Sequence, residues 1–533
     1  MNSIKVPFRE PSITRKPSWI AGSKASGYPL CLPLATAIHT DTNDCACRAL
    51  RLACSLSPSD GERAGVRGAR TLSSDVAYRF RGQISRGGFA LLACLLLGWA
   101  PAYKASGIWV TAYYPGWEQG YMPASNVDFT AVTHIIHFSV VPNSNGTLDI
   151  GVNGITTANA TDLISRAHKA GVKVLICAGG ADSESGFQGA TSSANLATFI
   201  NQLCGLVSSY GYDGVDIDWE PLSSSDAEQY TNLINGLRAQ LNLFSPPRML
   251  TAAAGGGEST FAAVQNQFDQ INVMTYDLAG PWEGWVTWYN SPIYNGGYRF
   301  PSTGGLIPCA DSSIAGYLSA GVSAGELGIG VAFYGYVWAG GTGTSTGGVS
   351  EPRQSWTTAP TSTSTDYNTI MSTYFQSNLY HYDAVAQAAY LGIDNPGSTN
   401  DKFIPYDDER VCQAKVSYAF NQGLGGVMIW ELGSGYRSTQ PSGQRDSLLQ
   451  AVKQAAAGPG KISAQVSGQD LCLSFSGAAM GSYRVQRSTS LASATWTTVT
   501  LTNVPGPGGI LTVTDKGALT NGVSSFYRVQ TPP

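Results

Sequence analysis

The sequence predicts an α/β protein, a (β/α)8 TIM barrel with a small insertion after its seventh strand, followed by a C-terminal all-β sandwich domain. Over the middle of the chain, short apolar runs alternate with helical patterns, which is the order of a parallel sheet with crossover helices. After about residue 457, short alternating strands separated by Gly, Pro and Ser replace that order. This second pattern is typical of a small antiparallel sandwich.

Eight apolar runs qualify as buried barrel strands. They cover residues 108–114, 133–140, 172–178, 214–218, 249–254, 271–276, 327–333 and 426–430. Helical patterns lie between them, for example at residues 158–170, 194–209, 225–241 and 409–421. Eight such units favour a closed barrel over an open sheet, and a barrel carries its chemistry at the carboxyl ends of its strands.

The predicted barrel domain covers residues 107–457, with the insertion at about 336–408 and the sandwich at 458–533. The first part of the insertion is rich in Gly, Ser and Thr, and its later part is rich in aromatic residues. We expect the insertion to form one side of the substrate cleft. In the sandwich, Tyr-Arg-Val-Gln occurs at 483–486 and again at 527–530, which suggests paired strands. Trp496 is either a core residue or a stacking platform for a carbohydrate.

The segment 84–106 has the layout of a secretory signal. Arginines precede an apolar run at 89–100, and small residues follow it. The run is too short to span a bilayer, so we expect a secreted protein with no stable membrane span in its mature form. Residues 1–83 are then a disordered leader or a misassigned start. A lipoprotein cleavage box at Leu91-Leu92-Ala93-Cys94 is the alternative, although Cys94 lies inside the apolar run.

Charge and cysteine content exclude several classes of partner. Residues 1–104 hold 14 of the 32 Lys+Arg and 6 of the 36 Asp+Glu, so the remainder carries 18 against 30, a formal charge of −12. Such an acidic body, without a basic cluster, argues against nucleic acid and anionic membranes as partners. Five cysteines follow residue 104, so at least one of these five is unpaired within this part of the chain, unless it bridges to another chain. The spacing of Cys45, Cys47 and Cys54 does not fit a zinc site, and we expect no metal and no cofactor.

The segment Asp213-Gly214-Val215-Asp216-Ile217-Asp218-Trp219-Glu220 carries the predicted chemistry. Alternate side chains of a strand face one way, so Asp216, Asp218 and Glu220 share one wall of the barrel. Crowding and partial burial raise the pKa of at least one of these carboxyl groups, so a proton is retained near neutral pH. Glu220, one step past the strand end, is best placed to protonate a leaving oxygen.

This segment, as Asp213-x-x-Asp216-x-Asp218-x-Glu220, resembles the signature of glycoside hydrolase family 18, which contains many chitinases and some endo-β-N-acetylglucosaminidases. The resemblance covers roughly residues 107–455 and extends to five other segments. They are Tyr113-Tyr114-Pro115-Gly116-Trp117, Met274-Thr275-Tyr276-Asp277, residues 285–294, Phe333-Tyr334-Gly335 and residues 425–431. A (β/α)8 barrel is what this resemblance implies.

The resemblance implies substrate-assisted retaining catalysis, in which the acetamide of the substrate replaces an enzyme nucleophile. Glu220 is then the general acid and base. Asp218 would hydrogen-bond the acetamide N–H and balance positive charge, and Asp216 would hold or share a proton with it. Tyr276 would donate a hydrogen bond to the acetamide oxygen.

The same carry-over gives a set of substrate-binding and supporting residues. Asp277 and Tyr113 would position the sugar and its acetamide, and Trp430 would be the floor under the methyl group. The other substrate-binding candidates are Trp117, Met274 and Trp285. The supporting residues are Asp213, Cys177, Gly179 and Gly180. Cys177 stands where the family commonly has serine, and a thiol is a weaker donor than a hydroxyl; it is either a free thiol, which we favour, or part of a disulfide.

We therefore expect an endo-acting, monomeric chitinase that hydrolyses β-1,4 bonds between N-acetylglucosamine units. The insertion and the tryptophans Trp282, Trp285 and Trp288 favour a long groove for a linear polymer. An endo-β-N-acetylglucosaminidase acting on N-glycans is the alternative enzyme. A catalytically silent chitin-binding lectin on the same fold is less compatible with the presence of Glu220. The sandwich is either a spacer or a chitin-binding module.

Overall fold

The computed structural model describes residues 108–457, 463–477, 482–489, 495–503, 509–520 and 525–530. The leader predicted over residues 1–83 and the secretory signal predicted over 84–106 lie outside these ranges. Within them, no helix is both long enough and apolar enough to cross a membrane.

Eight parallel strands close into a barrel, as the sequence predicts. They are β1 (Trp109–Pro115), β2 (His134–Pro142), β4 (Lys173–Gly180), β5 (Gly214–Trp219), β6 (Met249–Ala254), β7 (Gln270–Val273), β8 (Leu327–Ala332) and β14 (Gly426–Trp430). The order β1-β14-β8-β7-β6-β5-β4-β2 is closed by pairing of β1 with β2. The short strand β3 (Leu148–Asp149) extends β2 in the antiparallel sense.

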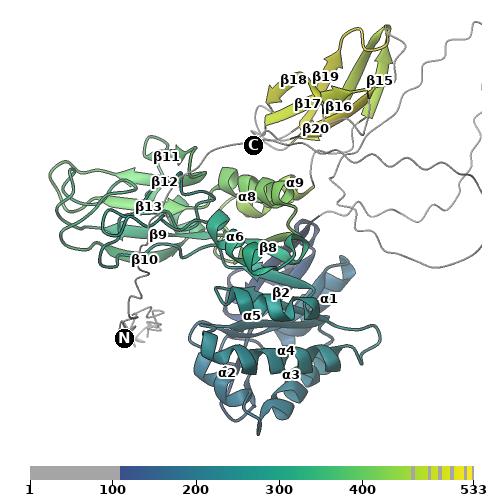
Figure 1. Ribbon diagram of the computed structural model, residues 1–533, viewed down its shortest axis with the longest axis vertical. Helices are drawn as coiled ribbons and strands as arrows, with labels where there is room; N and C mark the ends of the chain where they lie inside the picture. The colour runs from purple at the N-terminus through teal and green to yellow at the C-terminus, as the bar shows by residue number, and fades with distance from the viewer. Residues whose placement is uncertain are drawn as a thin grey trace, which may run out of the picture. The chain divides into compact units, whose positions relative to one another are not determined.

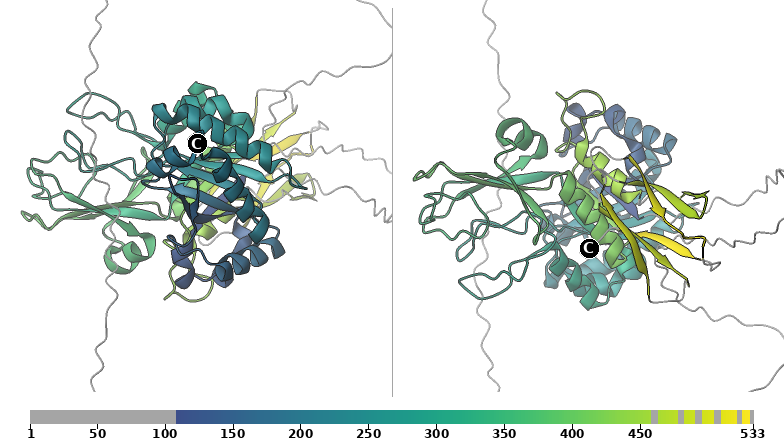
Figure 2. Two further views of the ribbon diagram at one scale, coloured as in Figure 1. Left: turned by 90° about the horizontal axis from the view of Figure 1, so that it is seen from below. Right: turned by 90° about the horizontal axis from the view of Figure 1, so that it is seen from above.

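Helices surround the barrel strands on the outside (Figures 1 and 2). They are α1 (Thr157–Lys169), α2 (Glu184–Ala190), α3 (Leu196–Tyr210), α4 (Ala227–Leu241), α5 (Glu258–Val264), α6 (Ala310–Ala320), α8 (Glu409–Gln422) and α9 (Ser447–Ala456). Glycine ends α3 at Gly211, α6 at Gly321 and α8 at Gly423, each in the left-handed conformation that glycine adopts at low cost.

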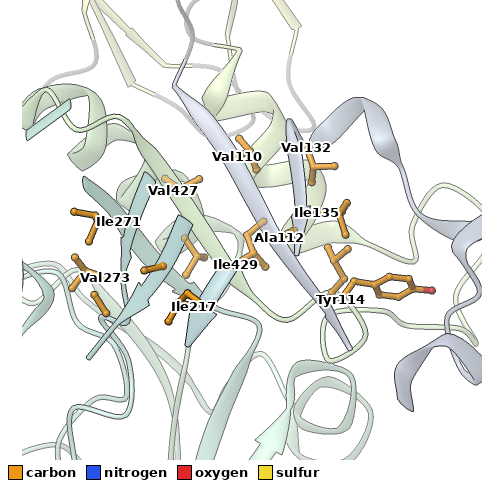
Figure 3. Close-up of a cluster of buried hydrophobic side chains, with 14 of the residues drawn as sticks. Val110, Ala112, Tyr114, Val132, Ile135, Ile217, Ile271, Val273, Val427 and Ile429 are labelled. Atoms are coloured by element: carbon orange, nitrogen blue, oxygen red, sulfur yellow. The ribbon is translucent and has the colours of Figure 1, made fainter. Parts of the chain in front are cut away.

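Alternation along each strand sends one set of side chains outward to the helices and the other into the barrel. The outward set forms the main hydrophobic core; Figure 3 shows Val110 and Ala112 of β1 beside Val427 and Ile429 of β14. The inward set at the carboxyl end includes a separate cluster of aromatic, aliphatic and sulfur-containing side chains. The functional candidates lie in and around this second cluster.

The insertion after β8 folds as an antiparallel sheet of order β10-β9-β13-β12-β11. Its strands are β9 (Tyr334–Ala339), β10 (Thr361–Asp366), β11 (Tyr380–Asp383), β12 (Ala388–Ile393) and β13 (Lys402–Tyr406). The loop after β7 packs on this sheet, because Val286 and Trp288 share a hydrophobic cluster with Trp338 and Phe403. A short helix, α7 (Tyr367–Thr369), follows β10.

The C-terminal region contains two three-stranded antiparallel sheets, as expected of a sandwich. One has the order β15-β16-β19 and the other β18-β17-β20. Their bounds are β15 (Ser463–Ser467), β16 (Asp470–Gly477), β17 (Ser482–Ser488), β18 (Thr497–Asn503), β19 (Gly509–Asp515) and β20 (Phe526–Gln530). One core contains Leu473 and Phe475 from the first sheet and Val485 and Tyr527 from the second. The repeated Tyr-Arg-Val-Gln segments lie on β17 and β20, which pair.

Asp213 precedes β5 at the amino end of the barrel, opposite the predicted site. Its buried carboxylate accepts hydrogen bonds from Lys173 Nζ at 2.8 Å, His168 Nε2 at 2.7 Å and the Val174 N–H at 2.9 Å. Burial alone would raise the pKa of Asp213, but these donors outweigh it and hold that pKa below its ordinary value. Asp213 therefore contributes stability above the ordinary pKa of aspartate, and this contribution is lost as the pH falls.

We expect Asp213→Ala to lower the free energy of unfolding by about 2–3 kcal/mol, because it leaves the Val174 N–H buried without a partner. Its ionic partners are partly exposed, which limits the loss. Urea denaturation measures the change. Asp162→Ala, which breaks an exposed i,i+4 pair with Arg166, should cost only about 0.5 kcal/mol or less. Equal losses in the two variants would contradict a stabilising role for Asp213.

Candidate active site

Three acidic side chains follow one another along and just beyond β5, where strand alternation places them on the inner wall. Asp216 is wholly buried and accepts hydrogen bonds from Tyr113 Oη at 2.8 Å and Thr251 Oγ1 at 2.6 Å. Burial raises the pKa of Asp216, while these hydroxyl donors and the Cys177 thiol lower it. Asp216 is thus a fixed, fully partnered group at the base of the row.

Asp218 and Glu220 lie at the carboxyl end of the row. Burial, followed by the charges of Glu220 and Asp216, raises the pKa of Asp218 well above its usual range. Burial also raises the pKa of Glu220 to about 7; the hydrogen bond with Asp218 opposes this shift, and the charges of Asp277 and Asp182 add to it. The two carboxyl groups therefore share a retained proton near neutral pH. The Asp218 Oδ1 atom is buried and has no hydrogen-bond partner among the residues that the structure describes.

Close backbone packing holds the end of β5 in place. Ser183 Oγ donates to the Asp218 carbonyl at 3.3 Å and accepts the Glu220 N–H at 3.2 Å. Gly179 and Gly180 have φ of +113° and +111°. A Cβ on Gly179 would lie 2.0 Å from the Asp218 carbonyl oxygen, so this position excludes any side chain. Gly179 pairs with Asp218 and Gly180 with Trp219 in the ladder between β4 and β5; the supporting role of the two glycines stays a prediction.

The aromatic residues predicted to hold an acetamide lie together inside the barrel end. The rings of Tyr113 and Trp430 are 5.4 Å apart, and Phe138 meets Trp430 edge to face at 4.8 Å. Within the described part of the chain, the Tyr276 hydroxyl has only a 3.5 Å contact to the Met428 sulfur, a weak acceptor. The Tyr276 hydroxyl, like Asp218 Oδ1, thus retains hydrogen-bonding capacity for a ligand.

Asp277 follows β7 and is joined to the insertion. Its Oδ1 atom accepts hydrogen bonds from Tyr334 Oη at 2.6 Å and Tyr336 Oη at 2.8 Å, both on β9. Surrounding protein raises the pKa of Asp277, and the two hydroxyls oppose that shift. Neither tyrosine was among the predicted site residues. Tyr334 lies in a segment that resembles the family, but its contact with Asp277 joins β9 to the loop after β7 and has no local signal in the sequence.

The outer candidates differ in exposure. Trp117 is 48% exposed and meets Phe138 edge to face at 5.6 Å. Trp282 is 43% exposed and stands 4.5 Å from the partly buried Trp285, while Met274 is partly buried beside the inner cluster. The expectation that Trp288 faces a groove is wrong. Its side chain is 0% exposed, and its Nε1 donates to the Pro308 carbonyl. The reason is that the loop after β7 packs Trp288 against the insertion.

Cys177 is a free thiol, as are Cys204, Cys309, Cys412 and Cys472. It is buried on β4 beside Asp216, to which it hydrogen-bonds. Burial, together with the charges of Asp216 and Asp218, raises the pKa of Cys177 well above its usual range. Cys177 is therefore protonated and donates to Asp216. The sequence left a disulfide open for this residue, and the structure excludes it within residues 108–457.

A closed (β/α)8 barrel with a proton-retaining pair of carboxyl groups at the end of an inner strand, beside an aromatic cluster, supplies the acid and the apolar surface that a glycoside hydrolase needs. The chain belongs to the glycosyl hydrolases family 18, whose sequence model matches residues 110–435. In the part of the chain that the structure describes, no group of three His, Cys, Asp or Glu side chains is arranged to hold a metal ion.

Two curated relatives and one solved structure illustrate this membership. Chitinase A1 of Niallia circulans is 29% identical over 433 residues, which cover 66% of this chain and 58% of that protein. Chitinase 1 of Aphanocladium album is 24% identical over 395 residues, 66% of this chain and 86% of the relative. The crystal structure of Ostrinia furnacalis Group IV chitinase in complex with allosamidin is 22% identical and has a TM-score of 0.57; the match covers 66% of this chain and 99% of that one. This structural likeness supports the fold.

Proposed function

We propose that the protein is a secreted chitinase that cleaves β-1,4 bonds between N-acetylglucosamine units within the polymer, by substrate-assisted retaining catalysis. The observation that carries this proposal is the buried, unpartnered Asp218 Oδ1 next to a carboxyl group, Glu220, whose pKa is raised to about 7. A buried acceptor without a partner is costly, and an acetamide N–H would satisfy it. The names of the curated relatives support chitin as the polymer.

In this mechanism the carbonyl oxygen of the bound acetamide attacks the anomeric carbon. The glycosidic C–O bond breaks, its electron pair stays on the leaving oxygen, and that oxygen takes the proton of Glu220. Asp218 accepts the acetamide N–H and balances the charge of the oxazolinium ion, while Tyr276 orients the carbonyl. The Glu220 carboxylate then takes a proton from water, whose oxygen attacks the anomeric carbon and reopens the ring with retained configuration.

Hydrolysis of chitin oligomers and of a high-mannose glycopeptide, measured side by side with Glu220→Gln as the control, tests this proposal. We expect the wild-type enzyme to cut the oligomers at internal bonds, with the β-anomer as the first product, and to leave the glycopeptide intact. Release of the glycan from the glycopeptide alone would establish the endo-β-N-acetylglucosaminidase alternative. Binding of the oligomers without hydrolysis would establish a lectin.

The pH dependence follows from the protonation state of Glu220. Burial and the nearby acidic charges raise its pKa to about 7, and a general acid must begin the reaction protonated. We therefore expect kcat/KM to fall as the pH rises through about 7, approaching tenfold per pH unit. Initial rates from pH 5 to 9 measure this limb. Asp182→Asn removes one of the charges that raise this pKa, so it should move the limb to lower pH; a limb that stays in place would contradict this electrostatic origin.

Export follows from the signal-like layout of residues 84–106. N-terminal sequencing of the protein recovered from culture medium tests it, and we expect a mature start shortly after that segment. A secreted product that retains Met1 would contradict this expectation. Binding of residues 459–533 to chitin beads, compared with a control protein, separates a chitin-binding role of the sandwich from a spacer role.

A further inference from the structure

The segment that carries Tyr276 and Asp277 is held from behind by two consecutive side chains. Asn290 Oδ1 accepts the Asp277 N–H at 2.8 Å, and Ser291 Oγ donates to the Thr275 carbonyl at 2.5 Å. Asp277 has φ of +58°, a conformation that a residue with a side chain keeps only when its surroundings hold it there. The backbone on both sides of Tyr276 is thus fixed by Asn290 and Ser291.

A buried cation lies directly behind Ser291. Lys415 of α8 is 0% exposed, and its ammonium group donates to Ser291 Oγ and to Asp407 Oδ2, the latter at 2.5 Å. Asp407 Oδ2 also accepts the N–H of Ala332, the last residue of β8. Lys415 therefore connects helix α8 with Asp407, which follows the last strand of the insertion, and with Ser291 in the loop after β7.

Desolvation makes such a pair an expensive way to stabilise a barrel, since apolar side chains of equal size often serve as well. The direction of the hydrogen bonds that Lys415 makes offers another explanation for the presence of this ion pair. An ammonium group only donates, so Ser291 Oγ must accept from Lys415 and direct its single proton elsewhere. The Ser291 O–H donates its hydrogen bond to the Thr275 carbonyl. The serine hydroxyl is therefore left with one orientation.

We propose that Lys415, paired with Asp407, is a positioning residue for catalysis: by fixing the Ser291 hydroxyl on the Thr275 carbonyl, it holds Tyr276 and Asp277 at the acetamide. This role rests on the proposed function, because only that function gives Tyr276 and Asp277 contact with substrate. Lys415 itself lies behind the loop and acts through Ser291.

Ser291→Ala is the sharpest test, since it removes one hydroxyl and leaves the ion pair in place. Because displacement of a reacting group by about 1 Å can cost 10²-fold, we expect kcat to fall by about 10-fold while KM stays within about twofold. Hydrogen exchange at the Asp277 amide, followed in peptides that cover residues 274–278, should become faster. The double variant Lys415→Met with Asp407→Asn removes both charges together and should reproduce both effects.

Tyr418→Phe is the matched control on the same helix. It removes the 2.8 Å hydrogen bond from Tyr418 Oη to Asp311 on α6, a link that does not reach residues 275–277, and should leave kcat and the Asp277 exchange rate unchanged. A Ser291→Ala variant, or a double variant, that unfolds at lower temperature but keeps the wild-type kcat and exchange rate would overturn the positioning role.

The two readouts also separate this inference from the proposed function. If the wild-type enzyme does not hydrolyse chitin oligomers, the proposed function fails. Faster exchange of the Asp277 amide in Ser291→Ala would then still support the inference that Lys415, through Ser291, fixes the backbone of residues 275–277. If the wild-type enzyme is active and Ser291→Ala matches it in kcat and exchange, the positioning role fails and the proposed function stands.

Discussion

Glu220→Gln is expected to lower kcat on chitin oligomers by about 10²–10⁴-fold or more. The amide keeps the size of the side chain and its ability to hydrogen-bond Asp218, but it has no proton to give to the leaving oxygen and cannot activate water afterwards. KM should change far less than kcat, since the aromatic contacts are untouched. Steady-state rates on a soluble oligomer, with a folded variant confirmed by its thermal unfolding, measure this loss.

Glu184→Gln provides the matched control. Glu184 begins α2 beside the site, and its backbone N–H, not its side chain, contacts the Glu220 carbonyl at 3.1 Å. The same change of acid to amide at this position should leave kcat near the wild-type value. Comparable losses in both variants would mean that local charge, and not proton transfer from Glu220, determines the rate. Near-normal activity of Glu220→Gln would refute the assignment of the acid.

Most of the barrel is predictable because each strand is a local, apolar run. The strand Gly426–Trp430 has the predicted bounds, and the alternation in β5 places Asp216 and Asp218 correctly on one wall. The sixth predicted strand, 271–276, ends earlier, at Val273, because the backbone leaves the sheet before Tyr276 and reaches a positive φ at Asp277. Helix α6 has only a weak apolar period in the sequence, because it contains many Ala, Ser and Gly residues.

The partners of the acidic row could not be predicted in the same way. Thr251 bonds Asp216 from a neighbouring strand, and Tyr336 bonds Asp277 across 59 residues of sequence. Such contacts depend on strand register and on how the insertion folds back, neither of which leaves a local pattern. Trp288 shows the opposite error. As an aromatic residue in a loop, Trp288 was expected to line a groove for the polymer. In the structure it is buried against the insertion and belongs to a hydrophobic core.

Asp218→Asn is expected to lower kcat by about 10²–10³-fold, the usual loss when one preorganised electrostatic contact to a transition state is removed. The amide can still accept the acetamide N–H, but it cannot balance the positive charge of the oxazolinium ion or share a proton with Glu220. Since that charge develops only during the reaction, KM should change little. Rates on N-acetylglucosamine oligomers measure the effect.

A thiazoline analogue of N-acetylglucosamine, protonated to copy the oxazolinium ring, separates charge balance from simple hydrogen bonding. We expect Asp218→Asn to weaken its binding far more than the binding of the neutral product, because the product lacks the ring charge that Asp218 balances. Equal weakening of both ligands would show that Asp218 only holds the acetamide N–H. In that case the positive charge of the intermediate must be balanced elsewhere in the acidic row, and Asp216, which Tyr113 and Thr251 hold in place, becomes the residue to replace next.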